Sequence, residues 1–267
     1  YAMEITTSEY GEGLEGVLHY RINDFWGTLN GVDYSVWNTD KDELIPYAYT
    51  KEDLSGKYEN KKYLLSKTGQ PYHPNVPLIG IISRLVSQKG FDLIADSIND
   101  LMKFNAQWII LGSGEYRYEE LFRYLAHTYP EKVSFLNAKD ERAAHLIEAA
   151  SDIFLMPSKY EPCGLNQIYS LKYGTVPVVR KTGGLADTVI DWDESRHHGS
   201  FAGNGFSFYD YTGEALVSSL ERALRCYHQK SVWSQIIYNG MIQNYSWKQS
   251  ARHYEKMYEH AIMKRRG

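Results

Sequence analysis

Residues 78–90 read Leu-Ile-Gly-Ile-Ile-Ser-Arg-Leu-Val-Ser-Gln-Lys-Gly, an apolar run followed by a loop that contains an arginine, a lysine and a glycine. Such an unbroken apolar run is typical of a strand buried on both faces. Similar runs recur along the chain, and stretches with apolar residues at helical spacing lie between them. The predicted strands are residues 78–84, 107–112, 133–138, 153–158, 176–181 and 205–210, and the predicted helices between them are 91–104, 115–128, 141–150 and 165–173. This alternation predicts an α/β fold with a doubly wound parallel sheet.

The composition excludes several classes of protein. The 267 residues include 29 Lys and Arg against 33 Asp and Glu, a net charge of −4, whereas domains held to nucleic acid by bulk charge are usually basic. No apolar run approaches the roughly 18 residues of a membrane span. Two cysteines cannot build a disulfide framework, which favours a reducing compartment. We therefore expect neither nucleic acid nor a membrane as a partner.

The flanks of the α/β region differ from it. Residues 1–75 contain turns rich in glycine, asparagine and aspartate without β/α alternation, and we interpret them as the tail of another structural unit plus a linker. Residues 212–228, 232–244 and 247–262 are predicted to be helical. Tyr1-Ala2-Met3-Glu4 does not resemble a signal peptide, and because the first residue is not methionine, we expect the chain to begin inside a longer protein.

The loops that follow the predicted strands are where ligands of such sheets bind. Arg84 and Lys89 follow the first strand, and a guanidinium and an ammonium group there could converge on a polyanion. The alternative is a solvated basic loop. Gly112 and Gly114 follow the second strand and could bring backbone amides close to a ligand, but a tight turn explains them more simply.

Two further loops combine a strand end with glycine at the start of a helix. In one of them, Glu161 could accept hydrogen bonds from sugar hydroxyls or be an ordinary acid at the start of a helix, and Pro162 fixes the turn. Cys163 is interpreted as a small buried filler, because no histidine partner is evident. In the other loop, Thr182, Gly183 and Gly184 could aim amides at an anion, or simply cap a helix. Four phosphate-compatible turns at one sheet edge predict a nucleotide-diphosphate site, and no metal site or cofactor is indicated.

Several of these motifs resemble those of bacterial glycogen synthases and plant starch synthases. The similar segments are 10–18, 30–33, 83–90, 157–165, 182–189 and 245–247, which span nearly the whole chain. The resemblance implies two facing Rossmann-like lobes, the GT-B arrangement, and retaining transfer of glucose from ADP-glucose, with UDP-glucose as the other candidate, to the non-reducing end of an α-1,4-glucan. The resemblance also implies that the protein is located in the bacterial cytoplasm, or in a plastid if the source is a plant.

The resemblance also assigns roles to individual residues. Arg84, Lys89 and Glu161 would be the catalytic residues, the first two on the donor diphosphate and Glu161 on the donor glucose. The implied donor-binding residues are Gly112, Gly114, Lys139, Cys163, Gly164, Leu165, Asn166, Thr182, Gly183 and Gly184. The implied partners are a nucleotide-diphosphoglucose, an α-glucan acceptor and an N-terminal lobe that is largely missing. The implied domains are 1–75 as its remnant plus a linker, 76–245 as a Rossmann-like nucleotide-sugar-binding domain, and 246–267 as a helix returning toward the N-terminal lobe.

Two positions depart from wider relatives. Tyr169 stands where many of them have a second glutamate, so no second acid is invoked. Lys139 stands where many place a tyrosine near the adenine, which leaves the preference for ADP over UDP open. Two other functions remain open: a nucleotide- or glucan-binding module without turnover, and, less favoured, a nucleotide-sugar epimerase. If the N-terminal lobe is largely missing, we expect Trp247, Tyr254 and Tyr258 to be exposed or covered by a neighbouring copy of the chain.

Overall fold

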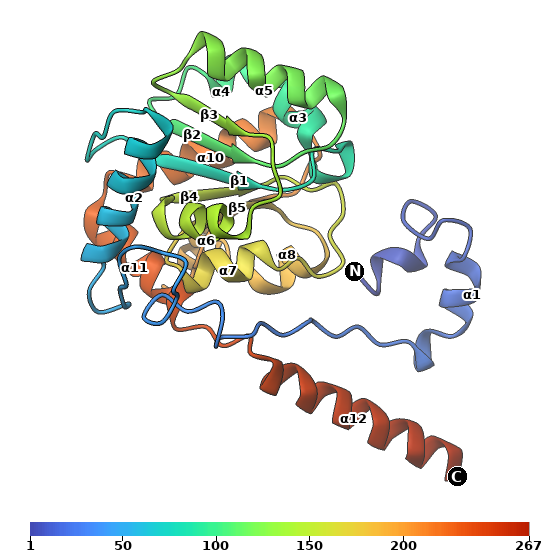
Figure 1. The fold of residues 1–267 in the computed structure, drawn as a ribbon. Coiled ribbons are helices and arrows are strands. Elements are labelled where there is room, and N and C mark those ends of the chain that lie inside the picture. The colour runs from blue at the N-terminus through green and yellow to red at the C-terminus, as the bar shows by residue number, and fades with distance from the viewer. Residues whose placement is uncertain (267) are drawn as a thin grey trace.

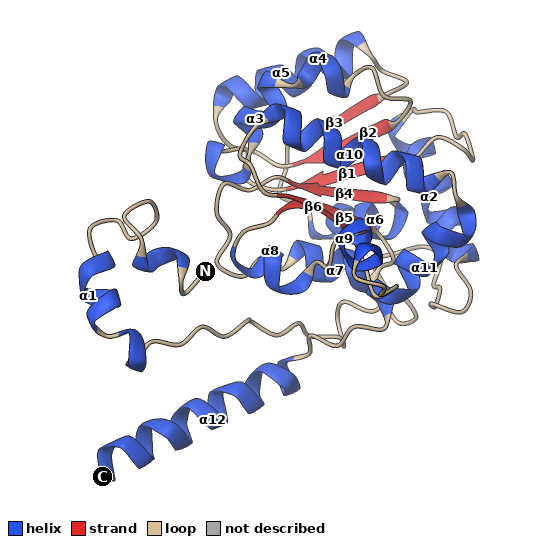
Figure 2. Ribbon diagram, turned by 180° about the vertical axis from the view of Figure 1, so that it is seen from behind, coloured by secondary structure: helices blue, strands red, loops and turns tan. Residues whose placement is uncertain are grey.

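A computed structural model describes residues 1–266 and contains one six-stranded sheet with helices on both faces (Figures 1 and 2). All strand pairs are parallel, and the order is β3-β2-β1-β4-β5-β6. The strands are β1 (Leu78–Ile82), β2 (Gln107–Leu111), β3 (Val133–Leu136), β4 (Ile153–Met156), β5 (Val176–Arg180) and β6 (Phe206–Phe208). Each lies inside a predicted run, and the predicted doubly wound α/β fold is confirmed.

Alternate residues of the strands face the two helical layers, as the pleat of a strand requires. Ile79 and Ile81 of β1 belong to the core under α3 (Phe91–Asp96), α5 (Tyr116–Thr128) and α10 (Gly213–Tyr227). Leu78 belongs to the core under α2 (Ser55–Thr68) and α6 (Glu141–Ala150). Packing on both faces explains why the strands read as continuous apolar runs.

The remaining helices complete the two layers. α7 (Asn166–Lys172) and α8 (Gly183–Thr188) follow β4 and β5, while α11 (Lys230–Met241) packs on α7 and α10. The predicted helix over 91–104 is divided at the buried Ser97 into α3 and α4 (Ile98–Leu101). The short segments are η1 (Glu4–Thr6), α1 (Glu15–Tyr20), η2 (Ile22–Asp24), η3 (Ser87–Lys89) and α9 (Trp192–His197).

Helix α2 was not predicted, because its buried side includes two lysines in place of an apolar stripe. Lys57 and Lys61 are 3% and 2% exposed. The Lys61 ammonium group pairs with Asp152 at 2.6 Å, and the Lys57 ammonium group donates to the Tyr173 carbonyl at 3.0 Å. These bonds offset part of the desolvation of the two lysine side chains and fix α2 against the sheet. The division of the chain at residues 75 and 245 stays a prediction, but α2 packs within the α/β body.

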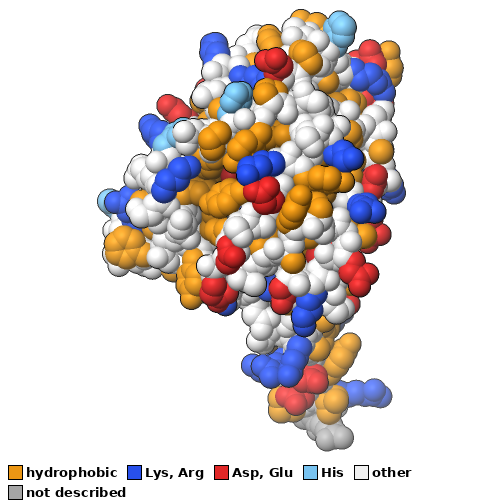
Figure 3. Space-filling model, turned by 60° about the vertical axis from the view of Figure 1, so that its left-hand side comes forward, with side chains coloured by type: hydrophobic (Ala, Val, Ile, Leu, Met, Phe, Trp, Pro, Cys, Tyr) orange, Lys and Arg blue, Asp and Glu red, His pale blue; other side chains and the backbone are white. Residues whose placement is uncertain are grey.

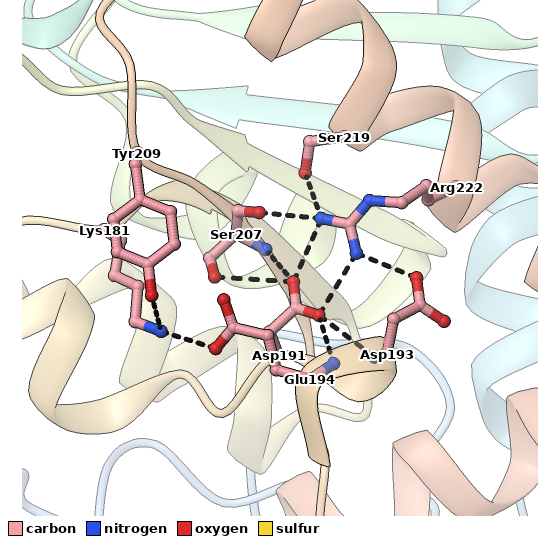
Figure 4. Close-up of polar contacts among 8 residues, drawn as sticks. All are labelled: Lys181, Asp191, Asp193, Glu194, Ser207, Tyr209, Ser219 and Arg222. Atoms are coloured by element: carbon pink, nitrogen blue, oxygen red, sulfur yellow. Dashed lines mark hydrogen bonds and ion pairs between the residues drawn. The ribbon is translucent and has the colours of Figure 1, made fainter. Parts of the chain in front are cut away.

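A buried ion cluster joins β6, α9 and α10 (Figure 4). Asp191 accepts hydrogen bonds from the amides of Asp193 and Glu194 at the start of α9, and from the Ser207 amide at 2.6 Å. The Arg222 guanidinium of α10 binds both oxygens of Asp191, at 3.1 and 3.0 Å. Burial opposes ionisation of Asp191, but its bonds and charge interaction with Arg222 outweigh burial and lower the pKa of the carboxyl group.

Most of the first 30 residues, including α1, and α12 (Trp247–Arg266) stand off the α/β body in both ribbon views (Figures 1 and 2). They pack against each other: the Trp26 ring lies 4.9 Å from the His260 ring, and Lys264 pairs with Asp24. Trp247 and Tyr258 are 49% and 64% exposed, as predicted, while Tyr254 is partly buried.

One face of the surface carries interspersed charges of both signs rather than a single basic or acidic patch, and α12 protrudes below it (Figure 3). Among residues 1–266 no helix is long and apolar enough to cross a membrane.

Candidate functional site

Two adjoining cavities lie beyond the carboxyl ends of the central strands. The first, about 210 Å³, is lined by Arg84, Lys89 and Glu161. The second, about 470 Å³, is lined by Gly112, Lys139 and the start of α6. Arg84 and Asn166 line both, so the two cavities form one cleft. The strand order reverses between β1 and β4 at this point, which is where doubly wound sheets bind ligands.

The catalytic residues expected from the sequence are brought together in the first cavity. The Lys89 ammonium group lies 2.5 Å from Glu161 Oε2 and forms an ion pair with it. The Ser158 hydroxyl donates to the same carboxylate oxygen at 3.2 Å, and Glu161 is 7% exposed. Arg84 is exposed at the rim shared by the two cavities. A buried carboxylate beside two cations is equipped to bind an uncharged polar group and an anion side by side.

The loops that hold Lys89 and Glu161 pack directly on each other. Gly90 has φ +79°, and a Cβ atom there would overlap the Pro157 carbonyl group. The Lys159 amide donates to the Gln88 carbonyl at 2.9 Å. Only glycine combines this backbone conformation with so close an approach. The short distance between the ammonium and the carboxylate therefore follows from the contact between the two backbones.

The start of α7 forms another wall of the first cavity. Gly164, Leu165 and Asn166 all line it, and Gly164 has φ +68°. The Asn166 side-chain amide donates to the Ile82 carbonyl at 2.7 Å, which ties the helix to the end of β1. Their role in binding the donor stays a prediction.

Gly112 and Gly114 lie where the loops after β1 and β2 meet. Gly112 lines the second cavity, and a Cβ atom on it would overlap the Ser83 carbonyl oxygen. The Gly114 amide donates to Glu119 Oε1 at 2.9 Å. Close packing of two loops accounts for both glycines, as the tight-turn alternative predicts. Gly112 lines the second cavity, but its amide is engaged like that of Gly114, because it donates to the Leu136 carbonyl at 3.0 Å.

The turn formed by Thr182, Gly183 and Gly184 lies against the Glu161 loop, and its amides bond to protein acceptors. The Gly184 amide donates to the Glu161 carbonyl at 3.0 Å. The Gly183 amide and the Thr182 hydroxyl donate to the carboxylate of Glu4, at 2.8 Å and 3.0 Å. The structure thus places this turn in support of the Glu161 loop. No sequence signal pointed to Glu4, whose partners lie almost 180 positions along the chain.

Cys163 lies beside the cleft, toward the first 30 residues. It lines a different cavity of about 680 Å³, and its sulfur accepts a hydrogen bond from the Asn30 amide at 3.3 Å. Burial raises the pKa of the Cys163 thiol, which disfavours the reactive thiolate. These features agree with a packing role for the side chain. Within the described residues, no group of three or more histidine, cysteine, aspartate or glutamate side chains could hold a metal ion.

A six-stranded parallel sheet with a charged cleft at its switch point places the chain in the class of doubly wound, Rossmann-like α/β domains. The family model described as glycosyl transferases group 1 matches residues 69–240, and the chain belongs to this family.

Similar proteins include the glycogen synthases of Thermosipho melanesiensis and Koribacter versatilis. Each is 46% identical to 98% or more of this chain. The structure of the catalytic domain of starch synthase IV from Arabidopsis thaliana, bound to ADP and acarbose, matches 98% of the chain with a TM-score of 0.91 and 36% identity. The match covers 54%, 53% and 54% of these three proteins, so the chain spans about half their length. The resemblance predicted from the motifs is confirmed.

Proposed function

We propose that this chain is the donor-binding half of a glycogen or starch synthase. In the proposed reaction, glucose passes from ADP-glucose to the 4-hydroxyl at the non-reducing end of an α-1,4-glucan, with retention at the anomeric carbon. The observation that carries the proposal is the convergence of Arg84, Lys89 and Glu161 on one cavity. The ADP and acarbose that accompany the Arabidopsis starch synthase support the choice of ligands.

Each residue has a proposed role that its position permits. Arg84 lies at the rim common to both cavities and would bind the diphosphate, with the sugar in the first cavity and the nucleoside in the second. Lys89 would bind the same diphosphate, and Glu161 would accept hydrogen bonds from the glucose hydroxyls. The two cations would stabilise the negative charge that develops as the bond from glucose C1 to the diphosphate oxygen breaks. The bond from C1 to the acceptor oxygen forms, and the acceptor proton leaves with the diphosphate.

The remaining partners follow from the same proposal. The acceptor glucan and an N-terminal lobe would face the cleft, and the chain alone would act as a nucleotide-binding module without turnover. ADP-glucose is preferred here to UDP-glucose on the strength of the ADP-bound relative. A bacterial cytoplasmic setting, rather than a plastid, stays a prediction.

A transfer assay tests this function. In a full-length protein that contains this chain, Arg84→Ala and Lys89→Ala should each reduce glucosyl transfer from ADP-glucose to glycogen by about 100-fold or more, because a cation is lost from the developing charge. Arg225→Ala is the control, since Arg225 is an exposed residue of α10. Near-normal turnover in both variants would refute the proposed site. Measurable elongation by these 267 residues alone would refute the view that the isolated chain is inactive.

A further inference from the structure

The first 30 residues, here called the arm, meet the α/β body at the loops beside the candidate site. The ring of Tyr160, next to Glu161, lies 6.4 Å from the Tyr1 ring and 6.3 Å from the Tyr10 ring. The Asn30 amide bonds to Cys163, as described above. In both ribbon views the N-terminus lies near α8, while α1 stands away from the body (Figures 1 and 2).

The most polar of these contacts is made by Glu4. Its carboxylate accepts the Gly183 amide at 2.8 Å and the Thr182 hydroxyl at 3.0 and 3.2 Å. Thr182 is 2% exposed, and its hydroxyl is directed at Glu4 rather than at the helix it precedes. Hydrogen bonds to a charged group are stronger than those between neutral groups. Glu4 therefore holds the turn from outside the body.

The turn held by Glu4 is in backbone contact with the Glu161 loop. The Gly184 amide donates to the Glu161 carbonyl at 3.0 Å. A Cβ atom on Gly183 would overlap the Glu161 carbonyl, and one on Gly184 would overlap the Cys163 carbonyl. With no free space between the two backbones, a shift of the turn must move the Glu161 backbone, because packed interiors are not continuously deformable. Two contacts thus connect the Glu4 carboxylate to the backbone of Glu161.

We propose that Glu4 is a positioning residue, which couples the arm to the sugar-binding loop by holding the turn of Thr182, Gly183 and Gly184 beneath Glu161. This inference rests on the proposed function, since it takes Glu161 as the residue that binds the donor sugar. Glu4 does not line the cleft cavities formed by Arg84, Lys89 and Lys139. Its loss should therefore weaken recognition of the sugar while leaving recognition of the diphosphate and base intact.

Calorimetry on this chain with two probes, ADP and ADP-glucose, separates these effects. Glu4→Ala should raise the dissociation constant for ADP-glucose about tenfold, the effect expected when a charge-assisted hydrogen-bonded contact is lost, and leave that for ADP within about twofold. Glu4→Gln keeps an acceptor oxygen and should fall between wild type and Glu4→Ala. Glu12→Gln removes an exposed charge from the same arm and serves as the control.

A second variant removes the contact from the other side. Thr182→Val deletes the hydroxyl donor, should weaken ADP-glucose binding about threefold, and should add nothing when combined with Glu4→Ala. Equal weakening of ADP and ADP-glucose, or unchanged binding of ADP-glucose in both Glu4→Ala and Thr182→Val, would overturn the coupling role alone. Failure of the wild-type chain to bind ADP would overturn the proposed function, and this inference with it.

Discussion

Lys89 follows β1 and Glu161 follows β4, and their side chains form an ion pair of 2.5 Å across the switch point of the sheet. The ammonium group that is proposed to bind the donor diphosphate is therefore already neutralised by a carboxylate. A diphosphate that enters the cavity must share Lys89 with Glu161, and it also meets the negative charge of Glu161 at close range.

The ion pair predicts that replacement of Glu161 has opposite effects on ADP binding and on glucose transfer. Glu161→Gln removes the competing charge, so ADP should bind about fivefold more tightly to the chain, with a steeper dependence on salt. In a full-length protein the same variant should transfer glucose at least about 100-fold more slowly, because a contact to the donor sugar is weakened. Calorimetry and a transfer assay measure the two effects. Weaker ADP binding to Glu161→Gln would contradict the idea that the pair competes with the ligand.

Lys139 offers a test of how the base is bound. It is exposed and lines the second cavity, at the place where wider relatives have a tyrosine. Lys139→Tyr would supply a ring on which a base can stack, a contact worth roughly 1–3 kcal/mol for a nucleic-acid base. ADP should then bind about fivefold more tightly, and UDP less so, because uracil has the smaller ring. Lys139→Met is the control for loss of charge, and an equal response to ADP and UDP would argue against stacking at this position.

The sequence predicted the sheet and the location of the cleft for one reason. Strands buried on both faces are continuous apolar runs, and the loops after parallel strands must meet at one edge. The sequence alone therefore predicted that Arg84, Lys89 and Glu161 lie at one edge of the sheet, although they are up to 77 positions apart in the chain (161 − 84). The structure adds the ion pair between Lys89 and Glu161, because a distance between side chains depends on how two loops pack.

Other features could not be predicted from periodicity. Helix α2 buries Lys57 and Lys61. Their ammonium groups bond to a carbonyl and a carboxylate that are distant in the sequence, and these bonds allow the lysines to be buried. The sequence alone left open whether the Thr182 turn binds an anion or caps a helix, because it does not show what its amides bond to. A carboxylate from Glu4 satisfies two of its donors, and no local pattern connects Glu4 with Thr182.

Glu148 of α6 is expected to make the stability of the chain dependent on pH. Its carboxyl group is 1% exposed, accepts a hydrogen bond from Ser170 at 2.7 Å, and has a second oxygen without a partner among the described residues. Burial raises its pKa to about 8. A raised pKa in the folded state means that the stability gained from the protonated group is fully present below about pH 4.5 and lost as the pH rises through about 8.

Glu148→Gln should remove this dependence, since the amide keeps an acceptor for Ser170 and never ionises. The melting temperature of the variant should match that of wild type near pH 4.5 and exceed it by about 3 °C or more at pH 8. Burial lowers the pKa of nearby Lys57 to about 7, and the charge of Glu148 opposes that shift, so part of the difference between the variant and wild type reflects Lys57. Glu141→Gln, an exposed change on the same helix, is the control. A constant difference between variant and wild type across this pH range would refute the assignment.

The Arg222 cluster predicts a large loss of stability from a position outside the cleft (Figure 4). Arg222→Ala would leave the fully buried Asp191 carboxylate without its cation, and breaking a buried pair in this way typically costs about 3–5 kcal/mol. The amides of Ser207, Asp193 and Glu194 still bind Asp191, so a loss of about 3 kcal/mol is expected. Arg222→Lys keeps the charge but not the bidentate contact with Asp191, so it should lose less stability than Arg222→Ala.

Urea denaturation measures the free energy of unfolding for each variant, with Arg225→Ala as the matched control. Arg225 lies on the same helix, and its ion pair among the described residues is an exposed contact of 3.9 Å with Glu221, so its replacement should change stability by less than about 0.5 kcal/mol. Because the pKa of Asp191 is lowered in the folded state, its contribution is present above about pH 3.8 and lost as the pH falls through the lowered value. The difference between wild type and Arg222→Ala should therefore shrink on acidification. An Arg222→Ala protein as stable as Arg225→Ala at pH 7 would show that the three backbone amides alone support the Asp191 carboxylate.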